Sequence, residues 1–319
     1  MTDNSFSTED YQQEYLIAAI SESTRLAYDK AWRDFVDYCN RHNVEPLLAP
    51  PDIVANCLIE KATKPSLETG KPLSVGTVSV ICCAINRRYK DHEKASPTDH
   101  PKVKMILNGL RRKLGRPPRR VKALRERQIR EMIKACGTTT IGLRDAAVLA
   151  LGFSAALRRS EICALKVDDI EFLPKEDGGG LIVNICKSKT DQEAKGQQVA
   201  IPKGKYIQPA KHLRRWMKKA GIKNGYLFRT LRRNGALRGD KLHHDDVART
   251  VKKYAEMIGL NPKEYAAHSL RAGFVTSAAV HNARLDKIME VTRHTNTATV
   301  MKYIRDQNRF KDHAGQNFL

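Results

Sequence analysis

Apolar residues recur at helical spacing through the first 115 residues of the chain. The pattern predicts helices around residues 28–39, from Pro51 through residue 58, after Ser74, and from about Lys102 to Leu114. Pro50 and Pro51 favour a helix start, and Ser74 is a suitable N-cap. The first stripe consists of Tyr28, Trp32, Phe35, Val36 and Cys39. Roughly four or five helices in this length indicate a compact bundle.

Prolines and arginines interrupt the helical pattern at Gly115-Arg116-Pro117-Pro118-Arg119-Arg120. The prolines cannot continue a helix, and the arginines favour contact with water. This segment is therefore the expected linker between two domains. The predicted boundaries are a helical N-terminal domain at 1–115, a basic linker at 116–123, and a second domain with a C-terminal tail at 124–319.

Helical periodicity resumes after the linker and is interrupted once by β-prone sequence. Residues 181–186 and 198–201 are short β-prone runs, and a polar stretch at 187–196 separates them. They predict an antiparallel hairpin with a long turn. Helices are expected at 127–134, 143–154, from about Arg159, and at 206–220, 246–258, 269–281, 285–292 and 297–303. The expected fold class is mainly α with a small antiparallel β-sheet (α+β).

The net charge indicates what this helical protein binds. The 319 residues carry a formal charge of +22 at pH 7, and the sequence pI is near 9.8. Like charges repel within a compact fold, and solubility alone does not require one sign in such excess. Nucleic acid and an anionic membrane surface are the commonest partners for a charge of this kind.

The positive charge is concentrated around the linker. Between Pro101 and Arg130 there are twelve Lys or Arg residues and one acid, Glu126, a net of +11, which is half of the charge of the whole chain. A solvated basic face is the alternative for any charge run, but a run this one-sided between two domains favours a surface that lies on phosphates. The residues expected to contact DNA here are Arg111, Arg112, Lys113, Arg116, Arg119, Arg120 and Lys122.

The termini and the cysteines favour an intracellular protein. The segment from Met1 to Asp10 is polar and acidic, unlike a secretory signal, and no stretch approaches the roughly 20 apolar residues that span a bilayer. The seven cysteines contain no Cys-x-x-Cys pair, and most lie in apolar runs, which is typical of reduced core residues. We therefore expect a cytoplasmic, nucleoid-associated protein whose partner is nucleic acid and not a membrane.

Common cofactor signatures are absent or weak. No Gly-rich phosphate loop that ends in Lys-Ser or Lys-Thr occurs, so no nucleotide cofactor is expected. The sequence His243-His244-Asp245-Asp246 has the composition of a metal site, but Asp245 or Asp246 is better placed as the cap of the helix that follows. No metal is expected.

Three segments place charged or titratable residues inside apolar helical stretches. They run from Gly152 to Ile162, from Ala267 to Phe274, and from Thr292 to Tyr303. An arginine or histidine at a helix start is more often a cap or a surface ion pair than a catalyst, so no segment is informative alone. Their order and spacing carry the inference.

Together these segments resemble the tyrosine recombinase (phage integrase) family. The family pattern is an arginine in a Leu-Arg-x-Ser/Ala-Glu context, a lysine on a β-hairpin, His-x-x-Arg, and then His or Trp nine residues before a tyrosine. The chain supplies, in this order, Arg158 with Glu161, Lys189, His268 with Arg271, and His294 with Tyr303. The resemblance covers the whole second domain, and the sequence around the tyrosine is most like that of the simple, Cre-like members.

The resemblance also implies an architecture. The N-terminal helical domain corresponds to a core-binding, DNA-binding domain, and the second domain corresponds to the catalytic domain. The two would form a C-shaped clamp around duplex DNA.

The family implies a role for each residue. Tyr303 is the nucleophile that forms a 3′-phosphotyrosine, and Arg158 and Arg271 bind the non-bridging oxygens of the phosphate. Guanidinium suits this task because its planar fork of donors keeps its charge. His268 is the expected general base, since a free tyrosine has a pKa of about 10. The remaining members are His294, which is expected to hydrogen-bond the phosphate, and Glu161, which is expected to orient a neighbouring Arg or His.

The hairpin lysine leaves an alternative open. Lys189 lies in the context Ser188-Lys189-Thr190, which is most like the family's, and is expected to protonate the leaving 5′-oxygen. Lys187 and Lys195 lie nearby, and contact with the DNA backbone without a catalytic role remains the alternative for both. Lys187 is counted among the expected DNA-binding residues.

The chain has ten tyrosines, so the choice of nucleophile has competitors. Tyr254 lies on a helical apolar stripe and is expected in the core. Tyr265 precedes His268 by three residues and is expected to pack beneath it. Only Tyr303 has the histidine nine residues upstream.

The predicted activity is site-specific DNA recombination without metal or ATP. The family implies a homo-tetramer on two double-stranded DNA sites, a four-way junction, and a C-terminal segment that docks on the neighbouring protomer, here the tail from Arg309 to Leu319. Two alternatives remain. One is a type IB topoisomerase-like or resolvase-like strand-transfer enzyme, and the other is a non-catalytic DNA-binding regulator on the same scaffold, against which the complete residue set argues.

Overall fold

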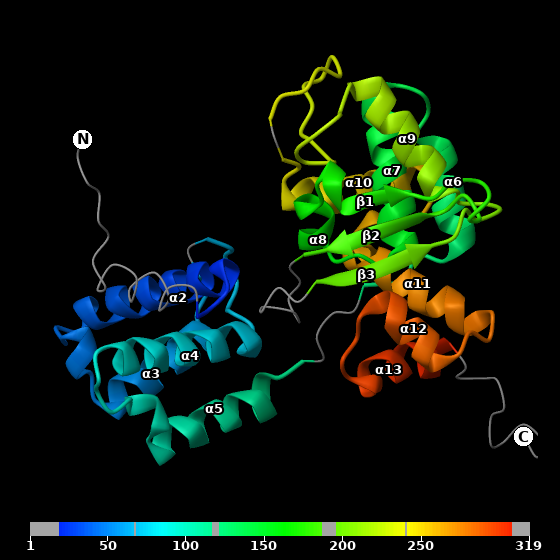
Figure 1. Cartoon of the computed structure of the whole chain (residues 1–319). Helices are drawn as coiled ribbons and strands as arrows, with labels where there is room; N and C mark the ends of the chain where they lie inside the picture. The colour runs from blue at the N-terminus through cyan, green and yellow to red at the C-terminus, as the bar shows by residue number, and fades with distance from the viewer. Residues whose placement is uncertain (1–18, 67, 117–120, 187–195, 240, 308–319) are drawn as a thin grey trace, which may run out of the picture. The chain divides into compact units, whose positions relative to one another are not determined.

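Two compact units make up the chain, residues 1–118 and residues 119–319. The computed structural model describes residues 19–66, 68–116, 121–186, 196–239 and 241–307 (Figure 1). Each unit has its own buried hydrophobic cluster. Helices dominate both units, and the second unit also contains one small antiparallel sheet, so the expected mainly-α fold class is confirmed.

Helices form the described part of the N-terminal unit. They are α2 (Glu22–Arg41), α3 (Pro51–Thr63), α4 (Val75–Asp91) and α5 (Pro101–Leu114). Helix α2 packs on α4, and α3 packs on α5. The predicted start signals are present, because α3 begins at Pro51 and the Ser74 hydroxyl accepts a hydrogen bond from the amide of Thr77 at the start of α4. The core of this unit includes Phe35, Val54, Leu58, Ile81 and Ile85.

Helix α7 (Thr140–Ser154) is the centre of the second unit, and every residue from Gly142 to Phe153 is buried. It contacts four helices: α6 (Glu126–Ala135), α9 (Pro209–Ala220), α10 (His244–Met257) and α11 (His268–Val280). The other helices of the unit are α8 (Arg159–Ala164), α12 (Leu285–Thr292) and α13 (Thr297–Gln307). Short 3₁₀ turns occur at Pro46–Leu48, Pro97–Asp99, Val167–Asp169 and Pro262–Glu264.

The sheet has the strand order β1-β2-β3, and both neighbouring pairs are antiparallel. Its strands are β1 (Ile170–Phe172), β2 (Leu181–Ile185) and β3 (Gln197–Ile201). The predicted hairpin is present as β2 and β3, with Val183 opposite Val199. The edge strand β1 was not predicted, because three residues are too few to show a period-2 pattern.

The starts of α9 and α10 differ from the predictions for identifiable reasons. Helix α9 begins at Pro209 and not at Tyr206, because Gln208 adopts a left-handed backbone with φ of 48° and ends the preceding segment. The cap of α10 is His243, whose side chain accepts a hydrogen bond from the amide of Asp245. Asp246 supplies the reciprocal bond, since its carboxylate accepts from the amide of His243. Asp246 is therefore part of the cap, as a partner of His243.

Buried positions mostly follow the apolar pattern. Tyr254 is in the core as predicted, with its hydroxyl donating to Asp145, and Tyr265 is also buried. All seven cysteines are unpaired. The interpretation of the cysteines as core residues is wrong for Cys83 and Cys186, which are exposed.

Candidate active site

A sharp turn between α7 and α8 presents two backbone carbonyls to two arginines. Ala156 has a left-handed backbone with φ of 47°, which is unusual for a residue with a side chain. The carbonyl of Ala156 accepts a hydrogen bond of 2.7 Å from Nη1 of Arg271, and the carbonyl of Ala155 accepts one of 3.2 Å from Nη1 of Arg293. The strained turn therefore fixes two guanidiniums that come from distant parts of the sequence.

The buried carboxylate of Glu161 lies between two arginines. Its Oε1 accepts a hydrogen bond of 2.8 Å from Nη1 of Arg158, and its Oε2 accepts one of 2.7 Å from Nη2 of Arg293. Oε2 also accepts from the backbone amide of Arg158, the N-cap residue of α8. Burial alone would raise the pKa of Glu161, but the charge of Arg293 and the hydrogen bonds from Arg158 outweigh it and lower the pKa. Glu161 therefore stays ionised and holds both guanidiniums in place.

Arg271 is the most enclosed of these cations, since only 2% of the residue is exposed. Its Nη2 is buried and has no hydrogen-bond partner in the part of the chain that the structure describes. Burial, reinforced by the charges of Arg158 and Arg293, lowers the pKa of Arg271 to about 9. The side chain remains cationic at neutral pH, and an anion at Nη2 would supply the missing partner.

His268 and Tyr303 are in direct contact. The two helices that carry them, α11 and α13, pack on each other. Nε2 of His268 lies 2.8 Å from the Tyr303 hydroxyl. Tyr303 packs against a small apolar cluster of Val275, Ile288 and Val300. These residues come from α11, α12 and α13, so the cluster holds the face of α13 that carries Tyr303 against the other two helices. Burial, together with the positive charges of Arg271 and Arg158, lowers the pKa of His268. The imidazole is therefore neutral at pH 7 and can accept a proton.

His294 follows α12 and is held by the last residue of that helix. Its Nδ1 lies 2.8 Å from the Thr292 hydroxyl, and this hydroxyl donates a hydrogen bond of 2.7 Å to the carbonyl of Ile288. Because the hydroxyl has one proton, Nδ1 must be the donor to it. A neutral His294 therefore has its lone pair on Nε2. Burial, Arg271, Arg158 and other nearby positive groups lower the pKa of His294 to about 4.

Arg293 belongs to the same network and was not predicted. It is 6% exposed, has a left-handed backbone with φ of 56°, and links Glu161 to the segment that carries His294. The sequence did contain a signal, because Arg293 interrupts the end of an apolar helix directly before His294. That signal does not distinguish a buried partner of a carboxylate from an exposed helix-end cation.

The structure brings six of the seven predicted catalytic residues into one neighbourhood. Arg158 and Arg271 both act on the pKa of His268 and of His294, and Tyr303 acts on that of Arg271. Lys189, like Lys187, lies in the segment 187–195, outside the described residues. This segment joins β2 to β3. The paired residues of these strands that lie nearest to it are Ile185 and Gln197.

The predicted DNA-contacting residues that the structure describes in this part of the chain lie at two places. Arg111, Arg112 and Lys113 lie exposed in the last turn of α5, with Arg116 exposed just beyond it. Lys122, which is also exposed, forms an ion pair of 2.8 Å with Glu264. Arg119 and Arg120 lie outside the described residues.

The described residues contain neither a metal-binding cluster nor a membrane-spanning helix. No group of three or more His, Cys, Asp or Glu side chains there is arranged to hold a metal ion. No helix in that part of the chain has both the length and the apolar character needed to cross a membrane.

Known proteins resemble this chain in sequence and in fold. The sequence pattern of the phage integrase family matches residues 122–309. An integrase/recombinase XerD homologue of Selenomonas ruminantium is 32% identical over 298 residues, which cover 92% of this chain and 84% of that protein. Tyrosine recombinase XerA of Pyrococcus horikoshii is 31% identical over 184 residues, 58% of this chain and 56% of that protein.

Solved structures share the fold over most of the chain. The Tn1549 transposon integrase in complex with transposon right end DNA superposes with a TM-score of 0.60 at 16% identity, covering 94% of this chain and 96% of that one. A lambda integrase dimer bound to a COC′ core site gives a TM-score of 0.59 at 16% identity, with 96% of each chain covered. At this identity the two structures establish a shared fold.

Proposed function

Since the chain belongs to the phage integrase family and is a tyrosine-type site-specific recombinase, we propose that it cleaves and rejoins DNA strands through a 3′-phosphotyrosine on Tyr303. The observation that carries this proposal is the 2.8 Å contact between the Tyr303 hydroxyl and Nε2 of His268. The contact supports the proposal because a neutral His268 can accept the proton of Tyr303, whose hydroxyl also influences the pKa of the buried Arg271.

Cleavage exchanges one phosphodiester bond for another. The Tyr303 oxygen attacks the phosphorus, its proton passes to Nε2 of His268, and the bond from phosphorus to the 5′-oxygen breaks. The leaving 5′-oxygen takes a proton from Lys189 in this proposal. Rejoining reverses each transfer, so the exchange needs no ATP.

The arginines stabilise the charge that develops on the phosphate. Arg158 and Arg271 bind the non-bridging oxygens, and the unpartnered Nη2 of Arg271 is a donor already in place for one of them. Glu161 and Arg293 do not touch the phosphate in this scheme. They hold Arg158 and the His294 segment, so that the donors need little rearrangement when DNA binds.

His294 is proposed to hydrogen-bond the phosphate in its protonated form. Its lowered pKa and the Nδ1 contact to Thr292 leave Nε2 without a proton in the DNA-free protein. A phosphate carries negative charge, which raises the pKa of a neighbouring imidazole. DNA binding would therefore favour protonation of His294 at Nε2, and the protonated Nε2 could donate a hydrogen bond to the phosphate.

Duplex DNA is the proposed partner of both units. The structures of the Tn1549 integrase and lambda integrase contain DNA, and the exposed arginines at the end of α5 are suited to the phosphate backbone. We further propose that the two units act as a clamp on each site, that four protomers join two sites, and that exchange passes through a four-way junction. The tail from Arg309 to Leu319 is the proposed docking segment between protomers.

A trapping experiment tests the chemistry. The protein first selects its binding site from a random-sequence duplex library. The selected duplex is then nicked near the scissile phosphate, so that cleavage releases a short fragment carrying the 5′-hydroxyl and rejoining is prevented. We expect a protein–DNA adduct that survives denaturation and is missing in Tyr303→Phe. Tight binding without an adduct would favour a DNA-binding regulator, and an adduct without exchange between two duplexes would favour a topoisomerase-like or resolvase-like enzyme.

A further inference from the structure

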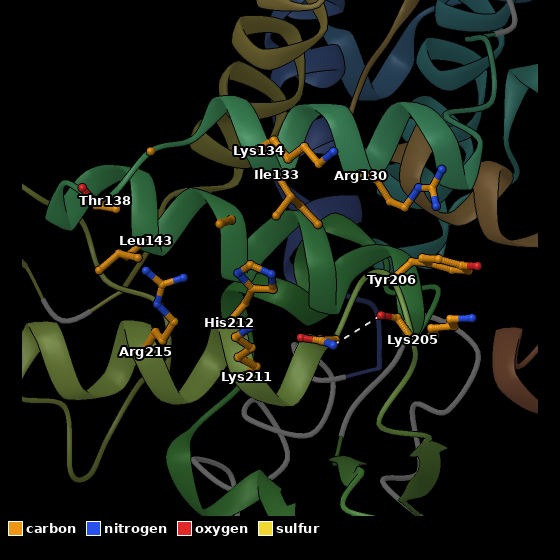
Figure 2. A pocket seen from close by; sticks show the side chains of 13 residues that line it. Arg130, Ile133, Lys134, Thr138, Leu143, Lys205, Tyr206, Lys211, His212 and Arg215 are labelled. Carbon is orange, nitrogen blue, oxygen red and sulfur yellow. Dashed lines mark hydrogen bonds between the residues drawn. The ribbon is translucent and has the colours of Figure 1, made fainter.

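A pocket of about 520 Å³ lies between α6, α7 and the start of α9 (Figure 2). One of its lining residues, Leu143, is in the first turn of α7, whereas the turn that leads to Arg158 follows the other end of that helix, at Ser154. Ala146 also lines the pocket, and a helix rises about 1.5 Å per residue, so roughly 12 Å of α7 separates the pocket from the active-site turn. The pocket is therefore distinct from the candidate active site.

Cations from two helices face this pocket without a carboxylate. Arg130 and Lys134 are four residues apart on α6, and Lys211 and Arg215 are four residues apart on α9. Like charges at this spacing destabilise a helix. Figure 2 shows the two helices on opposite sides of the pocket, so each contributes an unfavourable pair to the same space.

A neighbouring cation on α6, outside the pocket, does have a carboxylate partner. Arg127 of α6 is neutralised by Glu131, with Nε and Oε1 3.1 Å apart. The ion pairs of the described residues include none of the pocket cations. His212 also lines the pocket, and burial together with the charges of Arg215 and Lys211 lowers its pKa. Among the described residues, the pocket cations therefore have no carboxylate partner, and the lining contains no acidic side chain.

An aromatic ring and a tight turn hold the part of the pocket lining that precedes α9. The guanidinium of Arg130 lies 4.7 Å from the centre of the Tyr206 ring, and the ammonium of Lys205 lies 5.5 Å from it. Attraction to the ring favours these positions for both cations. The Gln208 side chain donates to the carbonyl of Lys205 at 3.3 Å and steadies the left-handed turn before α9. These donors are positioned before a ligand arrives.

We propose that this pocket binds a phosphate-bearing ligand. Arginine forks and lysine point charges together suit an oxyanion with several negative charges. Ile133 and Leu143 provide apolar surface beside the cations, which suits the sugar or base of a nucleotide. The volume lies within the usual range for small-ligand sites, about 300–1,000 Å³. The phosphate comes either from a free nucleotide or from the backbone of a DNA strand that lies outside the cleavage site.

Calorimetric titration of the full chain with inorganic pyrophosphate tests this proposal. The pocket variant is Lys134→Ala/Lys211→Ala, which removes one exposed lysine from each wall. The control is Lys218→Ala/Lys219→Ala, which removes two exposed lysines from the last turn of α9, outside the pocket. Both variants lose the same charge, and the arginines of the active site are intact in both.

We expect the pocket variant to bind pyrophosphate at least about tenfold more weakly than the wild type, since two charge-assisted contacts are lost, and the control to stay within about twofold. Equal affinity in the wild type and the pocket variant, or no binding by the wild type, would overturn the proposal.

Titrations with ADP and with a non-specific duplex identify the source of the phosphate. If the source is a free nucleotide, the pocket variant loses affinity for ADP and binds the duplex with an unchanged salt dependence. If the source is DNA, the plot of log K against log salt for the duplex becomes shallower in the pocket variant by about 0.9 for each lost contact, and not in the control.

Discussion

The Tyr303 hydroxyl and Nε2 of His268 lie 2.8 Å apart, although 35 positions separate the two residues in the sequence. The packing of α13 on α11 creates this contact, and the apolar cluster around Val275 and Val300 maintains it. A hydrogen bond of this length is the geometry required for proton transfer from a nucleophile to its base. The relationship leads to predictions for the rate, the stability and the covalent chemistry of the protein.

The pH dependence of strand cleavage should reflect the lowered pKa of His268. A histidine whose pKa lies below 6.5 stays neutral to lower pH, so it can still accept the Tyr303 proton in mildly acidic solution. We expect the acid limb of the cleavage rate at sub-saturating DNA to lie below pH 6.5. At saturating DNA the limb should move to higher pH, because the bound phosphate favours protonated histidine. Single-turnover cleavage measured against pH checks this, and an acid limb above 6.5 in the first condition contradicts it.

Glu161→Ala should be strongly destabilising. The substitution leaves Arg293, whose side chain is 2% exposed, without the carboxylate that balances its charge. Breaking a buried ion pair from one side typically costs about 3–5 kcal/mol. Urea unfolding of Glu161→Ala and Glu161→Gln measures the effect, and the amide should cost less because it keeps one acceptor oxygen.

Glu131→Ala is the matched control for Glu161→Ala. It breaks a pair with Arg127 in which both side chains are more than 40% exposed, so the loss should be small. Equal losses in the two alanine variants would show that the Glu161 carboxylate does not stabilise the buried arginines.

The stability of the wild type should fall between pH 6.5 and about 4 partly because of His294. Its pKa is about 4 in the folded protein, whereas an unfolded histidine titrates near 6.5. Below 6.5 the unfolded chain binds a proton that the folded chain does not, so the free energy of unfolding decreases as the pH falls. His294→Gln removes this contribution. As the pH falls from 6.5 to about 4, the free energy of unfolding of the wild type should therefore decrease by about 1–3 kcal/mol more than that of the variant. A difference that is independent of pH contradicts the assignment.

Gly273→Ala should cost about 3 kcal/mol or more, because an added Cβ on α11 would collide with the backbone carbonyl of Leu124. A backbone atom cannot move aside as a flexible side chain can. Gly109→Ala is the matched control, since Gly109 is exposed on α5 with open space around it, and there alanine should stabilise by about 0.5–1 kcal/mol. Thermal unfolding distinguishes the two, and similar shifts would refute the close approach of α11 to Leu124.

The sequence predicted most of the helices because their buried faces repeat at helical spacing. Phe35 and Cys39 of the first predicted stripe lie in the core of the N-terminal unit, with Tyr28 and Trp32 partly buried against it, and Tyr254 lies in the core of the second unit. Val36 of the first stripe is not part of that core. The hydrophobic pattern failed where an element was too short to show a period, or where a single residue determined the start of a helix. Strand β1 has three residues, and the start of α9 depends on one left-handed residue, Gln208.

The residues of the candidate site were easier to predict than the interactions that hold them. Arg158, His268 and Tyr303 have recognisable spacing in the sequence. The bond from Arg293 to Glu161 and the carbonyl of Ala156 on Arg271 depend on contacts between residues more than 100 positions apart. Such contacts follow from the packing of α7, α8, α11 and α12 and leave no periodic pattern in the sequence.

The most direct test of the central proposal is the identity of the residue joined to DNA. The adduct from the nicked duplex is digested with trypsin, which cleaves after Lys302 and Arg305, and the DNA-linked peptide is read by mass spectrometry. We predict the tripeptide Tyr303-Ile304-Arg305 with a 3′-phosphate ester on the tyrosine oxygen. A linkage to Tyr254, Tyr265 or any other residue, or an unchanged adduct in Tyr303→Phe, would contradict the assignment of Tyr303 as the nucleophile.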